Sequence, residues 1–280
     1  MRNFILTTSD YAKNTPEQSA VIALRPDGFS FLIRTQPHSI AAVGYVSTAA
    51  APQSAQYEQE LRRFLQQELL QQSFAQCSIL YAAQAVSMVP GEFYSEQHRT
   101  EVFTLTQALE SGETVAQQAL RGVDAVVLYA LPQNSVNTCN EELHRECRFF
   151  PQAASFIERS VAHNTLVRRK MLSISVESFY FDIVLAENGK LLFYNNFSFT
   201  NVNEFVHIVR MVCEQLQLVP QDVEIELSGK ISAASNYCKS LQLFFPHAQV
   251  VQQLNNDIDF SFNPLLFSVF TNLISLQLCE

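Results

Sequence analysis

The segment SAVIALRPDGFSFLIRT, residues 19–35, determines much of the predicted fold. Two strand-like runs flank the turn Pro26-Asp27-Gly28, and an Asp-Gly pair between such runs predicts a tight β-hairpin. The run IAAVGYVS, residues 40–47, extends this hairpin into a three-stranded meander. Apolar residues at helical spacing then predict a helix over 57–72, and a further strand follows over 78–82.

The same order of elements returns in the second part of the chain. The segment MLSISVESFYFDIVLAENGKLLFYN, residues 171–195, predicts three more strands joined by short turns. A helix over 203–217 and a strand over 223–227 follow, as they do in the first part. Elements that recur in the same order indicate an internal duplication. The sequence therefore predicts an α/β protein made of two βββαβ-based halves with mixed sheets.

We expect the first half to cover residues 1–170, with an insertion around 83–122, and the second half to cover residues 171–280. The second half would include an apolar C-terminal segment, Pro264–Leu278, which we expect to form a packed helix rather than a membrane anchor. The remaining expected elements are a buried strand over 123–131, a helix over 140–147, a strand over 148–150, a helix over 155–169 and a helix over 236–244.

Three segments carry a resemblance to a known family: IALRPDGFSFLI (22–33), KLLFYNNFSFTNVNEFVHIVRMVCEQLQL (190–218) and IELSGKI (225–231). Together they resemble a Bacteroidetes protein family without an assigned function, over residues 18–255. The resemblance implies a duplicated ribonuclease-H-like, actin-like ATPase fold. In that fold the nucleotide lies between the halves, held by one hairpin turn from each half and by an adenosine-binding segment.

The resemblance also implies where a nucleotide would bind. Asp27, Gly28 and Ser30 occupy the turn of the first half, and Ser228 and Gly229 occupy the adenosine segment. Glycine lets backbone N–H groups approach phosphate oxygens, and a carboxylate organises Mg²⁺ and its waters. These five residues are the expected binding residues if ATP with magnesium binds at all. An ordinary structural turn remains the alternative for the Asp-Gly pair.

The turn of the second half argues against nucleotide binding. It contains no glycine, and Phe179 and Tyr180 would fill the space that a phosphate needs. The chain has only 7 glycines, without an adjacent pair, and bulky Phe29 follows the first turn. We therefore expect that the fold remains while the ATPase activity is lost, with no catalytic residue and no cofactor. The predicted function is a non-catalytic binding or scaffolding module. The alternative is a divergent nucleotide-binding ATPase or phosphotransferase with its site in the cleft between the halves.

Two further features of the second half leave alternatives open. Asp182 lies within an apolar strand, where alternation favours an exposed position over a buried carboxylate at the cleft. Phe193, Tyr194, Phe197 and Phe199 surround the third strand, and we expect most of them in the core. If the sheet edge or the cleft is open, some of them would form an aromatic patch for a protein partner.

Composition narrows the classes of partner. The 280 residues include 18 Lys and Arg against 27 Asp and Glu, and the net charge of −9 argues against a nucleic-acid partner. The 6 cysteines form no CxxC pair, and Cys139, His144 and Cys147 lack a fourth ligand, so no metal site is expected. The start of the chain does not resemble a signal peptide and no stable membrane insertion is expected, which favours a cytoplasmic protein. The expected partner is another protein, with a second copy of the chain as a further candidate.

Overall fold

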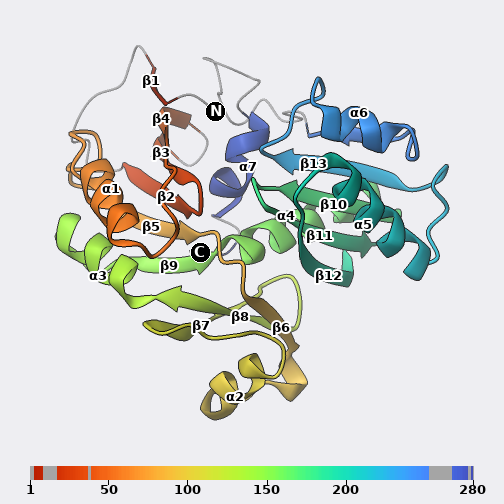
Figure 1. Cartoon of the computed structure of the whole chain (residues 1–280), viewed down its shortest axis with the longest axis horizontal. Helices are drawn as coiled ribbons and strands as arrows, with labels where there is room; N and C mark the ends of the chain where they lie inside the picture. Colours follow the sequence, from red (N-terminus) through yellow and green to blue (C-terminus); the bar gives the residue numbers. More distant parts are fainter. Residues whose placement is uncertain (1–2, 9–17, 37–38, 252–266, 277–278, 280) are drawn as a thin grey trace.

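The computed structural model describes residues 3–8, 18–36, 39–251, 267–276 and 279, and their strands form three sheets (Figure 1). The first half of the chain builds a six-stranded sheet with the order β1-β4-β3-β2-β5-β9. Its strands are β1 (Phe4–Thr7), β2 (Ser19–Arg25), β3 (Gly28–Gln36), β4 (Ser39–Ser47), β5 (Gln76–Tyr81) and β9 (Arg148–Pro151).

The second half builds a five-stranded sheet with the order β12-β11-β10-β13-β14. Its strands are β10 (Met171–Val176), β11 (Tyr180–Glu187), β12 (Lys190–Ser198), β13 (Glu224–Gly229) and β14 (Ala248–Val250). This order matches β4-β3-β2-β5-β9 strand for strand. Strand β2 pairs antiparallel with β3 and parallel with β5, and its equivalent β10 pairs antiparallel with β11 and parallel with β13. The predicted duplication and the mixed sheets are therefore confirmed.

The predicted Asp-Gly hairpin turn is present, and so are short turns between the strands of the second half. Gly28 begins β3 directly opposite Arg25, as a short Asp-Gly turn requires. In the second half, Asn188 and Gly189 adopt φ angles of 53° and 72°, both in the left-handed region. Two successive left-handed residues define a type I′ turn, whose twist matches that of the flanking strands.

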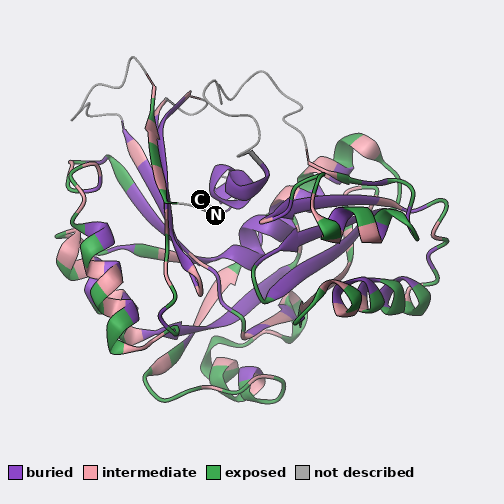
Figure 2. Ribbon diagram, turned by 45° about the horizontal axis from the view of Figure 1, so that its top comes forward, coloured by how far each residue is buried: buried purple, intermediate pink, exposed green. Residues whose placement is uncertain are grey.

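Helices cover both faces of each sheet. Helices α1 (Ala55–Leu65) and α3 (Gln133–Glu142) pack on the outer face of the first sheet, and α5 (Val202–Gln215) and α6 (Asn236–Gln242) on the outer face of the second. Helices α4 (Gln152–Val167) and α7 (Phe267–Ser275) lie between the two sheets, and Figure 2 colours both helices largely as buried. Residues 268–276 are all buried, so the prediction of a packed C-terminal helix is confirmed for the described part of that segment.

A small third sheet is inserted between β5 and α3. It has the order β6-β8-β7 and contains β6 (Val86–Pro90), β7 (Glu113–Ala119) and β8 (Ala125–Pro132). Two 3₁₀ turns, η1 (Gly91–Phe93) and η2 (Glu96–His98), and helix α2 (Arg99–Thr104) complete the insertion. Phe103 of α2 is fully buried against this sheet. The division of the chain into domains at residue 170 stays a prediction.

Several element boundaries differ from the sequence-based expectation. Helix α3 begins at Gln133, directly after β8, and not at residue 140. Its sequence, QNSVNTCNEE, is mostly polar, so it lacks the apolar periodicity by which helices are recognised. Helix α1 ends at Leu65 and not at residue 72, and Leu70 is buried although it lies in the turns that follow the helix. Among the described residues, no helix is both long enough and apolar enough to cross a membrane.

Candidate functional site

The hairpin turns of the two halves meet directly between the sheets. Arg25 ends β2 and Glu177 follows β10, so the two residues occupy equivalent positions in the duplication. Their side chains form an ion pair, with Arg25 Nε 3.5 Å from Glu177 Oε1, and are only 1% and 2% exposed. Gln152 of α4 donates a hydrogen bond of 2.9 Å to the same carboxylate oxygen, and Arg25 donates one of 2.6 Å to Ser30.

A second ion pair lies beside the first. Lys230 Nζ contacts the carboxylate of Asp27, and the hydroxyl of Ser178 donates to the other carboxylate oxygen. The same ammonium lies 4.0 Å from Glu177 and 3.4 Å from the hydroxyl of Tyr45. Burial alone would raise the pKa of Asp27, but the neighbouring cations and hydrogen bonds hold it below its ordinary value. We call this group the turn cluster, and its members are Arg25, Asp27, Glu177, Ser178 and Lys230.

Backbone groups near the turn cluster are engaged within the protein. Lys230 N–H donates to the carbonyl of Val176 at 2.7 Å, and Glu177 N–H donates to the carbonyl of Tyr180. Gly229 has a φ of 84°, and a Cβ there would lie 2.3 Å from the oxygen of Val176. A Cβ at Gly28 would lie 2.4 Å from the oxygen of Val46. The absence of a side chain at both glycines thus serves close packing between neighbouring strands.

The predicted nucleotide residues gather around this cluster, with one exception. Asp27 belongs to it, Gly28 follows Asp27, Ser30 is bonded to Arg25, and Gly229 precedes Lys230. Ser228 is the exception, since its hydroxyl bonds to groups outside the turn cluster. It donates to the carbonyl of Ile174 at 3.5 Å and accepts a hydrogen bond of 3.4 Å from Arg159.

The expectation that Phe179 fills the space between the halves is wrong. Its side chain is 54% exposed at the tip of the second turn, whereas Tyr180 is 2% exposed. Phe29 is buried against Tyr57 and Phe64, and so it packs on the side of α1. The contacts that join the turns come from charged side chains and Ser178, and the ring of Tyr180 is buried near Arg25 and Glu177.

Sequence reasoning missed Arg25, Glu177 and Lys230. Their pairing depends on how the halves approach each other, and Asp27 and Lys230 are far apart in the chain. One signal was available: opposite charges occupy equivalent positions at the ends of the two duplicated strands. With two cations and two anions, the ion pairs balance in charge and leave no surplus positive charge for a triphosphate.

Asp182 is buried, contrary to the position favoured by alternation. It is 2% exposed, because β11 is covered by α5 on one face and by α4 on the other. Burial raises the pKa of Asp182 to about 7, and nearby Glu177 adds to this rise. A hydrogen bond of 2.9 Å from the hydroxyl of Tyr194 acts in the opposite direction.

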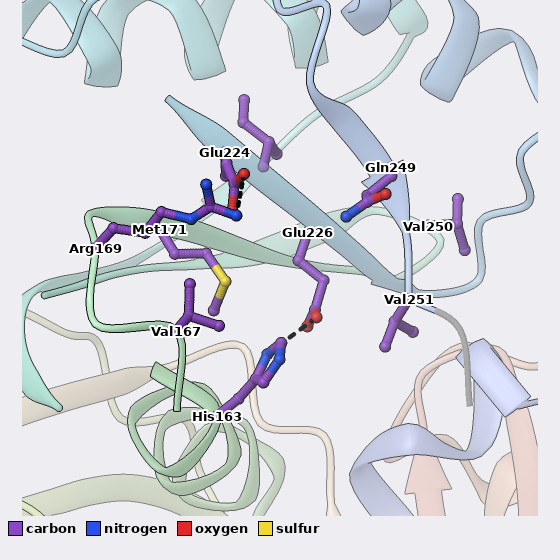
Figure 3. A pocket seen from close by; sticks show the side chains of 10 residues that line it. His163, Val167, Arg169, Met171, Glu224, Glu226, Gln249, Val250 and Val251 are labelled. Atoms are coloured by element: carbon purple, nitrogen blue, oxygen red, sulfur yellow. Dashed lines mark ion pairs between the residues drawn. The ribbon is translucent and has the colours of Figure 1, made fainter. Parts of the chain in front are cut away.

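A separate small cavity lies beside β13 and the end of α4 (Figure 3). Its volume is about 170 Å³, below the roughly 300–1,000 Å³ typical of small-molecule sites. Glu226 pairs with Arg159 at 2.6 Å and lies 3.2 Å from His163, and Glu224 pairs with Arg169 at 2.5 Å. Burial would raise the pKa of Glu226, but Arg159 and His163 lower it to about 2. These charges are already neutralised within the protein.

The paired sheets, the two inter-sheet helices and the facing turns define an actin-like ATPase fold. The chain belongs to the family described as protein of unknown function (DUF3822), which matches residues 9–248. No curated protein matches the chain. The resemblance stated from the sequence is thereby confirmed.

Solved structures of other proteins share this fold, including these three. A Bacteroides thetaiotaomicron protein with an actin-like ATPase fold and unknown function is 21% identical, with a TM-score of 0.78 over 98% of this chain and 100% of that one. PilM, in a PilM–PilN type IV pilus biogenesis complex, is 13% identical, with a TM-score of 0.60 over 95% and 99%. The ethanolamine utilization protein EutJ from Carboxydothermus hydrogenoformans is 10% identical, with a TM-score of 0.51 over 95% and 91%. At these identities the similarity shows the fold alone.

Proposed function

We propose that this chain is a non-catalytic actin-like protein that acts as a binding or scaffolding module for another protein. The observation that carries the proposal is the turn cluster. In an actin-like ATPase the two facing turns hold the phosphates, whereas here Arg25 and Glu177 join them through a buried ion pair. A triphosphate could enter only if these contacts broke, and breaking a buried ion pair is costly.

Two further observations support the proposal. The PilM structure is a complex with PilN, so a protein of this fold can hold a protein partner. The six cysteines are all buried free thiols, which supports a reducing compartment such as the cytoplasm. A divergent ATPase or phosphotransferase remains the second candidate, since Asp27, Gly28, Ser30 and Gly229 do gather at one place between the halves.

Thermal unfolding with and without Mg-ATP tests the proposal. A ligand at about one hundred times its dissociation constant stabilises the folded state by about 2.7 kcal/mol, which raises the Tm by several degrees. We expect no Tm change with Mg-ATP and no ATP turnover above background. A Tm increase with Mg-ATP in the wild type that is lost in Asp27→Asn would instead establish the nucleotide-binding alternative, because magnesium-dependent binding would then require the Asp27 carboxylate.

A further inference from the structure

The outer edge of β12 has no strand beside it among the described residues, whereas the equivalent edge in the first half is paired with β1. In the first half, the equivalent strand β4 pairs antiparallel with β1, from Phe4 opposite Tyr45 to Thr7 opposite Ala42. In the second half β12 ends the sheet, and no other described strand pairs with its outer side (Figure 1). The fold thus provides an internal comparison of a covered edge with an uncovered one.

This edge is long and nearly uncharged. The nine residues of β12 exceed the four of β1 and β9, the three of β14, the five of β6 and the seven of β7. Lys190 is its only charged residue, and it lies at the very start. Soluble proteins usually protect long edges with central charges, prolines or short length. The central part of β12 has neither a charge nor a proline, and its one irregularity is a bulge at Leu192, where the pairing with β11 shifts register.

The hydrogen-bonding pattern shows which backbone groups face outward. Phe199 N–H donates to the carbonyl of Phe179, so this pair is bonded toward β11. Bonded and non-bonded pairs alternate in antiparallel sheets, which directs the backbone groups of Tyr194, Asn196 and Ser198 outward. The N–H of Asn196 agrees with this assignment, since it donates to the side chain of Asn195 at 2.9 Å and not to β11, and a pairing strand would replace that local hydrogen bond. The side chain of Asn196 donates to the carbonyl of Gln84 at 2.7 Å, so the loop before β6 lies beside the middle of the strand.

Apolar side chains flank this edge. Leu192 is 51% exposed, and Phe193 and Phe197 are half-buried at the margin of the core beneath α5. An additional strand alongside β12 would cover part of these rings as well as pair the outward backbone groups.

We propose that the outer edge of β12 binds the same strand of a second copy of this chain, in antiparallel orientation. A twofold axis at Asn196 places Tyr194 opposite the partner's Ser198. The outward N–H and C=O groups of the two strands then face each other and can form hydrogen bonds. No like charges oppose each other along the strand. Lys190 comes near the start of the partner's α5, whose first turn carries Glu204. The two five-stranded sheets become one continuous sheet across the axis.

Self-pairing favours a second copy over an unrelated peptide, because the twofold axis brings outward backbone groups opposite one another and places Lys190 near the partner's α5, whose first turn carries Glu204. The inference names a partner for the proposed binding role, and it can fail separately. A dimer that also binds Mg-ATP would refute the proposed function alone, whereas a monomer that binds no nucleotide would refute the dimer alone.

Sedimentation velocity of the full chain over a concentration series tests the dimer. Ser198→Pro removes an outward N–H without touching a bond to β11, and Asn195→Lys places a charge in the middle of the edge. We expect a wild-type dimer and at least a tenfold, roughly 1.4 kcal/mol, weaker dimerisation in each variant. Gln118→Lys on the edge strand β7 is the matched control and should leave the dimer unchanged. Thermal unfolding checks that each variant folds.

Amide hydrogen exchange provides a second readout at the edge itself. The amides of Tyr194 and Ser198 should exchange more slowly as the protein concentration rises, whereas amides on β7 should not respond. A wild-type chain that stays monomeric at roughly millimolar concentration overturns the proposal. A dimer that survives both edge variants, or a monomer whose β12 edge binds only foreign peptides, overturns it as well.

Discussion

Replacing Arg25 by Met tests whether the turn cluster holds the two halves together. The substitution keeps an apolar side chain of similar length but leaves Glu177 buried, at 2% exposure, without its principal cation. Removing one partner of a buried ion pair costs about 3–5 kcal/mol. The hydrogen bond from Gln152 and the ammonium of Lys230 at 4.0 Å remain, so we expect the lower end of that range, about 3 kcal/mol.

A double-mutant cycle in urea unfolding isolates the interaction. Glu177→Gln should also cost about 3 kcal/mol, because it leaves the guanidinium of Arg25 buried without its anion. The double variant should lose less than the sum, with a coupling energy of about 2 kcal/mol. Arg99→Met serves as the matched control, because Arg99 pairs with Glu96 at 3.8 Å on the surface and should cost less than about 1 kcal/mol.

Additive single effects would contradict a direct interaction between Arg25 and Glu177. A coupling energy below about 0.5 kcal/mol would mean that Arg25 and Glu177 stabilise the fold independently. A loss from Arg25→Met no larger than that from Arg99→Met would mean that water reaches the turns. In either case the claim that ion pairs close the space between the turns would fail.

Two further predictions concern stability. The pKa of the Asp182 carboxyl is about 7 in the folded protein and about 3.8 in the unfolded chain. Between these values the folded state keeps a proton that the unfolded state loses, so the free energy of unfolding should fall as the pH rises from about 4 to 7. Asp182→Asn should remove this slope and stabilise the protein at neutral pH by up to roughly 4 kcal/mol, and urea midpoints across this range measure it; parallel slopes in the two proteins would contradict the assignment. Gly229→Ala should cost at least about 2 kcal/mol, because it combines a positive φ with a contact of 2.3 Å to Val176, whereas Gly112→Ala has a positive φ in open space and should cost less. Equal losses in the two glycine variants would show that the contact with Val176 relaxes.

Local patterns were sufficient to predict the duplicated core. The Asp27-Gly28 and Asn188-Gly189 turns set both hairpins, and the strands around them alternate clearly enough to fix their order. Short strands such as β1 and β14 escaped prediction, because three or four residues do not show a period. Asp182 was misplaced because alternation assumes one solvent-facing side, and here helices cover both sides of β11.

The candidate site was less predictable than the fold. Gly28 and Gly229 match the residues expected near a nucleotide, but their local role is close packing between strands. The charges that join the turns come from segments far apart in the chain, so their partners depend on the tertiary arrangement. Phe179 illustrates the same limit, since sequence shows its bulk but not the direction in which it points.

The position of α7 has a consequence for the way the chain folds. This helix contacts β2 and β3 of the first sheet as well as β13, and Arg34 of β3 donates to the carbonyl of Ile274 at 2.5 Å. The part of the inner face of the first sheet that α7 contacts therefore stays exposed to water until residues near 270 are available to cover it. Such distant dependence raises the contact order, which slows folding. During synthesis, the first half of the chain would expose apolar surface to which chaperones can bind and through which chains can aggregate.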